Sequence, residues 1–162
     1  MNNSYNGHLC IVFALEHYNP LNMIRAFGES GINPVYISVK RRYEVAIFSK
    51  YISKLHRVDS VEEGFRLLLD EYGNFDSDHK PYIVFSDDKS VGYFDLHYDE
   101  WKGKFIAYNA GKTGRINEFM DKYNIQQLAK KHGFNVLDSY VISKNDDLPK
   151  DLWYPIITKD IS

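Results

Sequence analysis

Apolar residues in the first part of the chain alternate between strand-length runs and a helical repeat. The run Leu9–Leu15 is uninterrupted, which is typical of a strand covered on both faces of a parallel sheet. Asn19 and Pro20 follow as the expected N-cap and first residue of a helix that ends at Gly31. Residues 34–39 form the next expected strand. Strand, helix and strand over about thirty residues predict a right-handed βαβ unit.

The middle of the chain continues this alternation. Residues 45–51 fit a helix or a strand equally, and residues 54–58 fit a short edge strand. Ser60 and Glu63 form a capping box ahead of an apolar helical stripe that ends at Gly73. The pattern therefore predicts one more strand and one more helix in this region.

A further apolar strand, Tyr82–Phe85, ends abruptly in polar residues that include Asp87 and Asp88. We expect these aspartates to cap a helix from about residue 89 to residue 98, the alternative being that they bind substrate. Residues 1–112 thus alternate strand and helix. This alternation predicts an α/β domain with an open, parallel, Rossmann-like sheet and helices on both faces.

Apolar residues beyond residue 112 fall on two opposite faces of a helical projection. Ile116 and Ile125 lie half a turn apart at about 100° per residue, so a single straight helix would be apolar on both sides. We therefore expect a break near Asp121, whose side chain would cap the second helix. Gly133 is expected to end that helix.

Two more strands are expected near the C-terminus. Val136–Ile142 is the first, and Tyr154–Lys159 is the start of the second. A domain seldom ends inside an apolar strand, because the strand would leave its backbone hydrogen bonds unmet. We therefore expect residues 113–162 to be the truncated beginning of a second domain in a longer protein.

Composition narrows the classes of function. Hydrophobic residues make up 44% of the 162 residues, which is typical of a globular protein. The net charge of −2 argues against nucleic acid as a partner. The only cysteine, Cys10, is expected to be a buried thiol in a reducing compartment. Residues 9–15 are too few to cross a bilayer and the N-terminus lacks a basic signal-peptide start, so we expect a cytoplasmic protein without a membrane partner.

Several polar motifs are candidate ligand sites. Glu16, His17 and Asn19 follow the first strand, where open sheets bind ligands, and are candidates to orient a small polar substrate; the alternative is a solvated turn. No Gly-x-Gly-x-x-Gly follows, which argues against NAD or FAD bound in the usual manner. Gly111–Thr113 is similar to the end of a P-loop, but that motif requires glycine where Ile106 stands. The histidine spacing predicts no metal site.

Two lysines have unusual positions. Lys122 lies three and seven residues before Ile125 and Ala129, so we expect it in the first turn of its helix, on the buried side. A cation there is disfavoured by burial and by the helix dipole unless an anion lies nearby. The alternatives are that its ammonium extends into solvent or pairs with Glu118. Lys159 likewise shares a strand face with apolar residues, the alternative being a solvated terminal side chain.

The C-terminal pattern resembles the opening of the ATP-grasp fold. In that superfamily, an Asp-Lys pair begins a helix that contains Leu-Ala and precedes a glycine, and a strand reading Tyr-Pro-Val-Ile-Ile-Lys-Pro follows. The similar segments here are Asp121-Lys122, Leu128-Ala129, His132-Gly133-Phe134 and Leu152–Lys159. The resemblance implies that Lys122 and Lys159 contact the phosphates of ATP.

The N-terminal part is similar to the Rossmann-like domain that precedes the ATP-grasp core in carbamoyl-phosphate-synthase-like proteins and carboxylate–amine ligases. The similar segments are Asn19-Pro20, Ser49-Lys50-Tyr51 and Ile83–Asp88. Two departures are Asp160, where the family usually has proline or alanine, and Val136–Ser139, which lacks a common proline.

This resemblance implies a ligase that activates a carboxylate with ATP and Mg²⁺ for attack by an amine or another nucleophile. The glycine-rich loop, the adenine hinge and the magnesium ligands would follow Ser162, so this piece alone would be inactive and would hold no cofactor. The alternative is a stand-alone Rossmann-like module that binds a small metabolite or a protein without catalysis. A homodimer is possible in either case.

Overall fold

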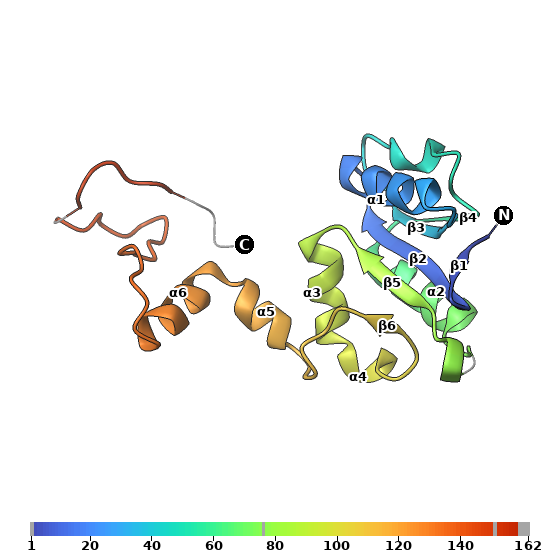
Figure 1. Cartoon of the computed structure of the whole chain (residues 1–162). Coiled ribbons are helices and arrows are strands. Elements are labelled where there is room, and N and C mark those ends of the chain that lie inside the picture. The colour runs from blue at the N-terminus through green and yellow to red at the C-terminus, as the bar shows by residue number, and fades with distance from the viewer. Residues whose placement is uncertain (1, 76, 151, 159–162) are drawn as a thin grey trace. The chain divides into compact units, whose positions relative to one another are not determined.

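The computed structural model describes residues 2–75, 77–150 and 152–158, apart from the side chain of Ser77. The chain divides into two units between Ile116 and Asn117. The first unit contains the sheet and most of the helices, and the second begins within a short helix (Figure 1).

The first unit is an α/β structure with a mostly parallel sheet. Its strands are β1 (Ser4–Tyr5), β2 (His8–Leu15), β3 (Val35–Val39), β4 (Lys54–Val58), β5 (Tyr82–Phe85) and β6 (Ile106–Ala107). The order across the sheet is β4-β3-β2-β5-β6 with all neighbours parallel, and β1 pairs antiparallel with β2. This arrangement confirms the predicted open α/β sheet and is consistent with a Rossmann-like fold.

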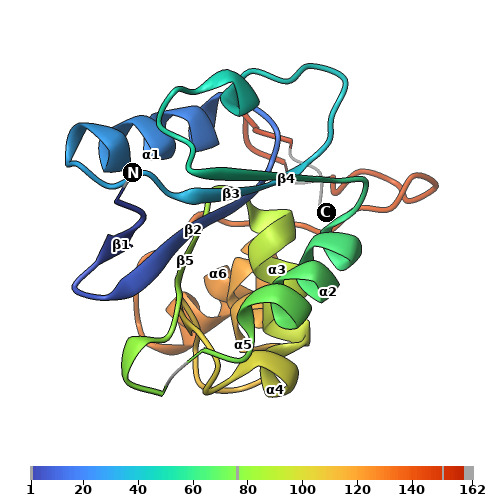
Figure 2. The same cartoon turned by 90° about the vertical axis from the view of Figure 1, so that its right-hand side faces the viewer.

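Helices cover both faces of the sheet, as predicted. One face carries α1 (Tyr18–Glu29) and the 3₁₀ turn η1 (Ala46–Phe48), and the other carries α2 (Val61–Tyr72), α3 (Asp88–Leu96) and α4 (Tyr98–Trp101) (Figure 2). A second 3₁₀ turn, η2 (Ser77–His79), precedes β5. The ambiguous segment 45–51 is therefore a short helical turn, and the expected edge strand at residues 54–58 is confirmed as β4.

Alternation along the central strands produces two apolar cores. Ile11 and Phe13 of β2 face α2 and α3, whereas Val12 and Ala14 face α1, and all four are inaccessible to solvent. Helices therefore cover the side chains on both faces of β2, which explains why the run Leu9–Leu15 contains no polar position.

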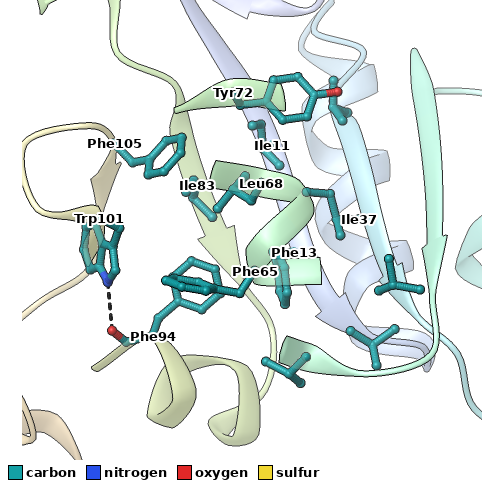
Figure 3. Packing of buried hydrophobic residues seen from close by; sticks show 14 of the residues in the cluster. Ile11, Phe13, Ile37, Phe65, Leu68, Tyr72, Ile83, Phe94, Trp101 and Phe105 are labelled. Carbon is teal, nitrogen blue, oxygen red and sulfur yellow. Dashed lines mark hydrogen bonds between the residues drawn. The ribbon is translucent and has the colours of Figure 1, made fainter. Parts of the chain in front are cut away.

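The larger core is built around aromatic rings. Phe13 of β2, Phe65 of α2 and Phe94 of α3 meet edge to face, with the ring of Phe94 4.9 Å from each of the other two (Figure 3). The indole N–H of Trp101 donates to the carbonyl of Phe94 at 2.8 Å, so this buried polar atom is satisfied. The cluster ties α2, α3 and α4 to the same face of the sheet.

The N-terminus forms a hairpin that the sequence analysis did not predict. Asn6 and Gly7 have φ angles of 50° and 85°, and they join the paired strands β1 and β2. Two consecutive residues with positive φ are what a two-residue hairpin turn requires, and Asn-Gly is its commonest sequence. This dipeptide was the available signal.

Two helix boundaries differ from the sequence-based expectation. The N-cap of α1 is His17, whose Nδ1 accepts from the backbone N–H of Asn19 at 3.2 Å, so Asn19 lies inside the helix. The helix expected to reach residue 98 instead ends at Leu96, and α4 begins after the His97 cap. By contrast, Ser60 caps α2 as predicted, accepting from Glu63 N–H at 3.0 Å.

The second unit consists of helical turns followed by irregular chain. The expected break is confirmed: α5 (Arg115–Met120) ends before Asp121, and Asp121 caps α6 (Lys122–Lys131). The Oδ1 of Asp121 accepts from the N–H of Asn124 at 2.8 Å. The helix ends before Gly133, as predicted. No residue of α6 is buried.

The expected strand at Val136–Ile142 is wrong, and residues 154–158 are also not a strand. Neither segment pairs with another strand within the described part of the chain, and a strand exists only through hydrogen bonds to a neighbouring backbone. Lys159, the last residue of the second expected strand, lies outside the described residues.

Candidate functional site

The carboxyl ends of β2 and β5 meet at the point where the strand order of the sheet reverses. From β2 the chain proceeds to β3 and β4 on one side, and β5 and β6 lie on the other. Ligands of open α/β sheets bind in the crevice at such a point. The sequence-based candidates Glu16, Asn19, Asp87 and Asp88 all follow one of these two strands.

Glu16 is buried at this edge, where protein groups surround its carboxylate. Its Oε1 accepts from the backbone N–H groups of Val45, Ala46 and Ile47, at 2.6 Å for Val45 and 3.3 Å for Ile47. The hydroxyls of Tyr36 and Ser38 donate to its Oε2, the second at 3.2 Å.

These five bonds use both carboxylate oxygens and hold the start of η1 over the end of β2. Burial and the hydrogen bond to Glu16 raise the pKa of Tyr36 above its usual range. The phenol therefore remains a proton donor to Glu16. In this arrangement the side chain of Glu16 positions a turn.

Asp87 joins the ends of the two central strands. Its Oδ1 accepts from Ser90 N–H at 2.8 Å, which caps α3, and its Oδ2 accepts from Leu15 N–H at 2.9 Å and from the Ser90 hydroxyl at 3.0 Å. The expected capping role of Asp87 is therefore confirmed, and the fold adds a link to β2.

The other two candidates at this edge face water. Asn19 and Asp88 are exposed in the first turns of α1 and α3, respectively. Next to them, the hydroxyl oxygen of Ser86 is buried without a hydrogen-bond partner within the described residues. A buried hydroxyl usually has a partner, so Ser86 is a further polar group at the end of β5 that has capacity for a hydrogen bond.

Lys122 occupies the first helical position of α6, as predicted, but it is exposed. The expectation that it projects toward a buried side is wrong for the structure as described, because α6 packs no residue into a core. Within the described residues, its ammonium forms no ion pair and no hydrogen bond, either with Glu118 or with another group. The predicted phosphate partner Lys159 lies outside those ranges.

Cys10 is a free, buried thiol, as expected, and burial raises its pKa. Within the described residues, no three His, Cys, Asp or Glu side chains converge so as to hold a metal ion. The same residues include no helix with the length and apolar character needed to cross a membrane.

One hollow of the surface involves residues that the sequence analysis did not treat as a site. It lies between α1 and residues 45–51, beside the turn that Glu16 holds. The spacing of Arg25, Phe48 and Lys50 along the chain carries no signal for it, because α1 and η1 are brought together only by the fold. Comparisons with protein-family models, with curated proteins and with solved structures give no match for this chain.

Proposed function

We propose that this chain is the N-terminal portion of an ATP-grasp ligase, in which a Rossmann-like unit precedes the nucleotide-binding domain. In the complete enzyme, a substrate carboxylate oxygen attacks the γ-phosphorus of ATP and ADP leaves. An amine or another nucleophile then attacks the acyl carbon of the acyl phosphate, loses its proton, and displaces inorganic phosphate.

The start of α6 is the observation that carries this proposal. The cap from Asp121 defines the first turn, and Lys122 is exposed there with no ion pair within the described residues. The N-terminus of a helix has a partial positive charge, so a lysine at this place is unfavourable until an anion joins it. A phosphate oxygen would be stabilised by both the ammonium and the helix dipole.

The proposed role of Lys122 and Lys159 is electrostatic. Phosphoryl transfer needs positioning and neutralisation of charge on the phosphate oxygens more than it needs proton transfer. Lysine ammonium groups meet that need. The described residues offer no set of ligands for Mg²⁺, so no step in this chain is assigned to that ion.

The first unit fits the proposal in its general architecture. An open sheet with the order β4-β3-β2-β5-β6 places the carboxyl ends of β2 and β5 together, and this edge would form one wall of the carboxylate site. Asn19 and Asp88 are exposed at this edge, and the hydroxyl of Ser86 has no hydrogen-bond partner within the described residues.

Calorimetric titration of the complete gene product with ATP and Mg²⁺ tests the proposal. We expect Lys122→Ala and Lys159→Ala each to weaken ATP binding about tenfold, because each removes one charge-assisted contact. Lys130→Ala, in the last turn of the same helix, is the matched control and should leave the affinity unchanged. Unchanged affinity in both test variants would overturn the proposal.

The reading frame beyond Ser162 provides a separate test. The proposal expects a continuing frame that encodes a glycine-rich loop and acidic residues for magnesium. A stop codon directly after Ser162 would instead favour the alternative, a Rossmann-like binding module without catalysis.

A further inference from the structure

A cavity of about 350 Å³ lies in the first unit between α1 and the segment 45–51. Its lining includes Leu21, Arg25, Val45, Phe48, Lys50 and Tyr51, and it is called the α1 pocket below. These residues come from one helix and one turn that are adjacent on the same face of the sheet (Figure 2).

Both walls of the α1 pocket are held in place by contacts outside it. The carboxylate of Glu16 accepts three backbone N–H groups at residues 45–47, which fixes the turn that presents Phe48. On the other side, Tyr51 packs against Gly28 of α1 so closely that a Cβ there would lie 2.1 Å from the ring. The pocket is therefore formed before any ligand arrives, which lowers the entropic cost of binding.

Two apolar residues of the lining are open to water. Phe48 is 80% exposed and Val45 is 44% exposed, although the neighbouring Ala46 is fully buried. A large apolar side chain on a fixed turn gains free energy when a ligand covers it, at about 25 cal/mol per Å² of buried apolar area. The exposed ring of Phe48 thus favours a ligand with an apolar body.

The charged part of the lining is entirely positive. Among the described residues, Arg25 and Lys50 line the pocket and no carboxylate does. Neither cation forms an ion pair with a carboxylate anywhere in the described ranges. The ammonium of Lys50 lies 5.0 Å from the centre of the Tyr51 ring, a cation–π contact that keeps it at the pocket. Charge complementarity therefore favours an anionic ligand.

We propose that the α1 pocket binds a small organic anion, in which a carboxylate or phosphate group is joined to an aromatic or branched apolar body. The anion lies between Arg25 and Lys50, and the apolar body covers Phe48. All the residues that line this pocket belong to the first unit, and the inference does not depend on the ATP-grasp proposal.

Titration of the ¹⁵N-labelled 162-residue chain, followed by amide chemical shifts, tests this inference. The probe is 3-phenylpropionate, and the matched neutral probe is 3-phenylpropanamide. We expect 3-phenylpropionate to shift the amides of Arg25 and residues 45–51 with a Kd on the order of 1–10 mM, as its size predicts. The amide probe should bind at least fivefold more weakly. Equal binding of the two probes, or shifts centred elsewhere, would overturn the proposal.

Phenyl phosphate and inorganic phosphate distinguish the two sources of negative charge and the need for an apolar body. Tighter binding of phenyl phosphate than of 3-phenylpropionate identifies a phosphate site, and the reverse order identifies a carboxylate site; both agree with the proposal. Binding of inorganic phosphate as tightly as phenyl phosphate contradicts it, because Phe48 would then contribute nothing.

Three variants assign the contacts. Arg25→Met and Lys50→Met should each weaken 3-phenylpropionate at least fivefold with little effect on the amide probe, whereas Phe48→Ser should weaken both probes. Arg41→Met, an exposed cation outside the pocket lining, is the control and should bind as wild type. All four positions are exposed, and unchanged amide signals from β2 verify the fold. An equal loss in Arg41→Met would show nonspecific charge attraction and would overturn the site.

Discussion

The two units of this protein carry similar apolar patterns but bury them differently. In the first unit, Ile11, Phe13 and their neighbours are inaccessible to solvent, because helices cover both faces of the sheet. In the second unit, Trp153 is 90% exposed and Ile157 is 82% exposed. An apolar run therefore becomes core only where strands and helices supply a surface on each side.

The helices of the two units differ in the same way. α2 places Phe65 and Leu68 in the core, so tertiary packing stabilises it. α6 has no buried residue, and its structure relies on the Asp121 cap at one end and on Lys130 and Lys131 in the last turn at the other. Isolated helices of this length are marginal in water, so α6 should be the more easily opened of the two.

The largest expected effect tests whether the aromatic core holds the first unit together. Phe94→Ala should lower the free energy of unfolding by about 4 kcal/mol, because it removes a buried ring that touches Phe13 and Phe65. Trp153→Ala in the second unit should change it by less than about 0.5 kcal/mol. Urea unfolding is followed by the fluorescence of Trp101. Phe94→Ala is therefore made in a Trp153→Phe background, which leaves Trp101 as the only tryptophan. Similar losses in the two variants would contradict the contrast between the units.

A second prediction compares a buried and an exposed carboxylate that both accept from backbone N–H groups. Glu16→Ala should cost about 3 kcal/mol, because it leaves buried donors of residues 45–47 without an acceptor. Glu16→Gln retains one acceptor oxygen and should cost roughly half as much. Asp146→Ala, which removes an exposed bond of 2.7 Å from Ser143 N–H, should cost under about 0.5 kcal/mol. Thermal unfolding of the three variants checks this order, and an Asp146 loss equal to that of Glu16→Ala would refute it.

A third prediction concerns the cap of α6. Asp121→Ala should destabilise this helix by about 1 kcal/mol, which speeds hydrogen exchange of its amides about fivefold. The amides of β2 should exchange at the wild-type rate, since no residue of α6 belongs to the core. An equal acceleration of exchange in α6 and β2 would contradict this prediction, because it would show that the two units open together.

The smallest expected effect is a pH dependence confined to the first unit. Burial lowers the pKa of His56, whose Nε2 lies 2.8 Å from the Tyr72 hydroxyl. The unfolded chain therefore binds more protons than the folded one as the pH falls through about 6.5, so acidification reduces stability. Between about pH 7.5 and 5.5, the wild-type protein should lose more stability than His56→Gln, which has no titrating group at position 56. Parallel urea titrations measure both losses, and identical losses would rule out His56 as the cause.

Features defined by neighbouring residues were predictable from the sequence. Ser60 and Asp121 were expected as N-caps, and both accept the bonds expected of them, because a cap acts on residues two or three positions away. The hairpin turn at Asn6 and Gly7 was missed despite its strong local signal. β6 is only two residues long and has no such signal, so its pairing with β5 was not predictable.

The candidate site was predictable in location but not in its bonding. The strand ends place Glu16 and Asp87 at the same edge of the sheet, which follows from the strand–helix alternation. The partners of Glu16 lie 20 to 31 residues further along the chain, and Leu15 lies 72 residues from Asp87. No local pattern relates residues so far apart.

The amino-acid sequence by itself determined the parallel α/β class, the order of the main strands and helices along the chain, and where the helices capped by Ser60 and Asp121 begin, because these depend on periodicity and on short-range hydrogen bonds. Only the tertiary structure decided that Glu16 holds a turn, that α1 and residues 45–51 line a positively charged pocket, and that the apolar segments after α6 are not strands. Periodicity specifies which residues share a face. Whether that face is buried depends on a partner surface that a distant part of the chain must supply.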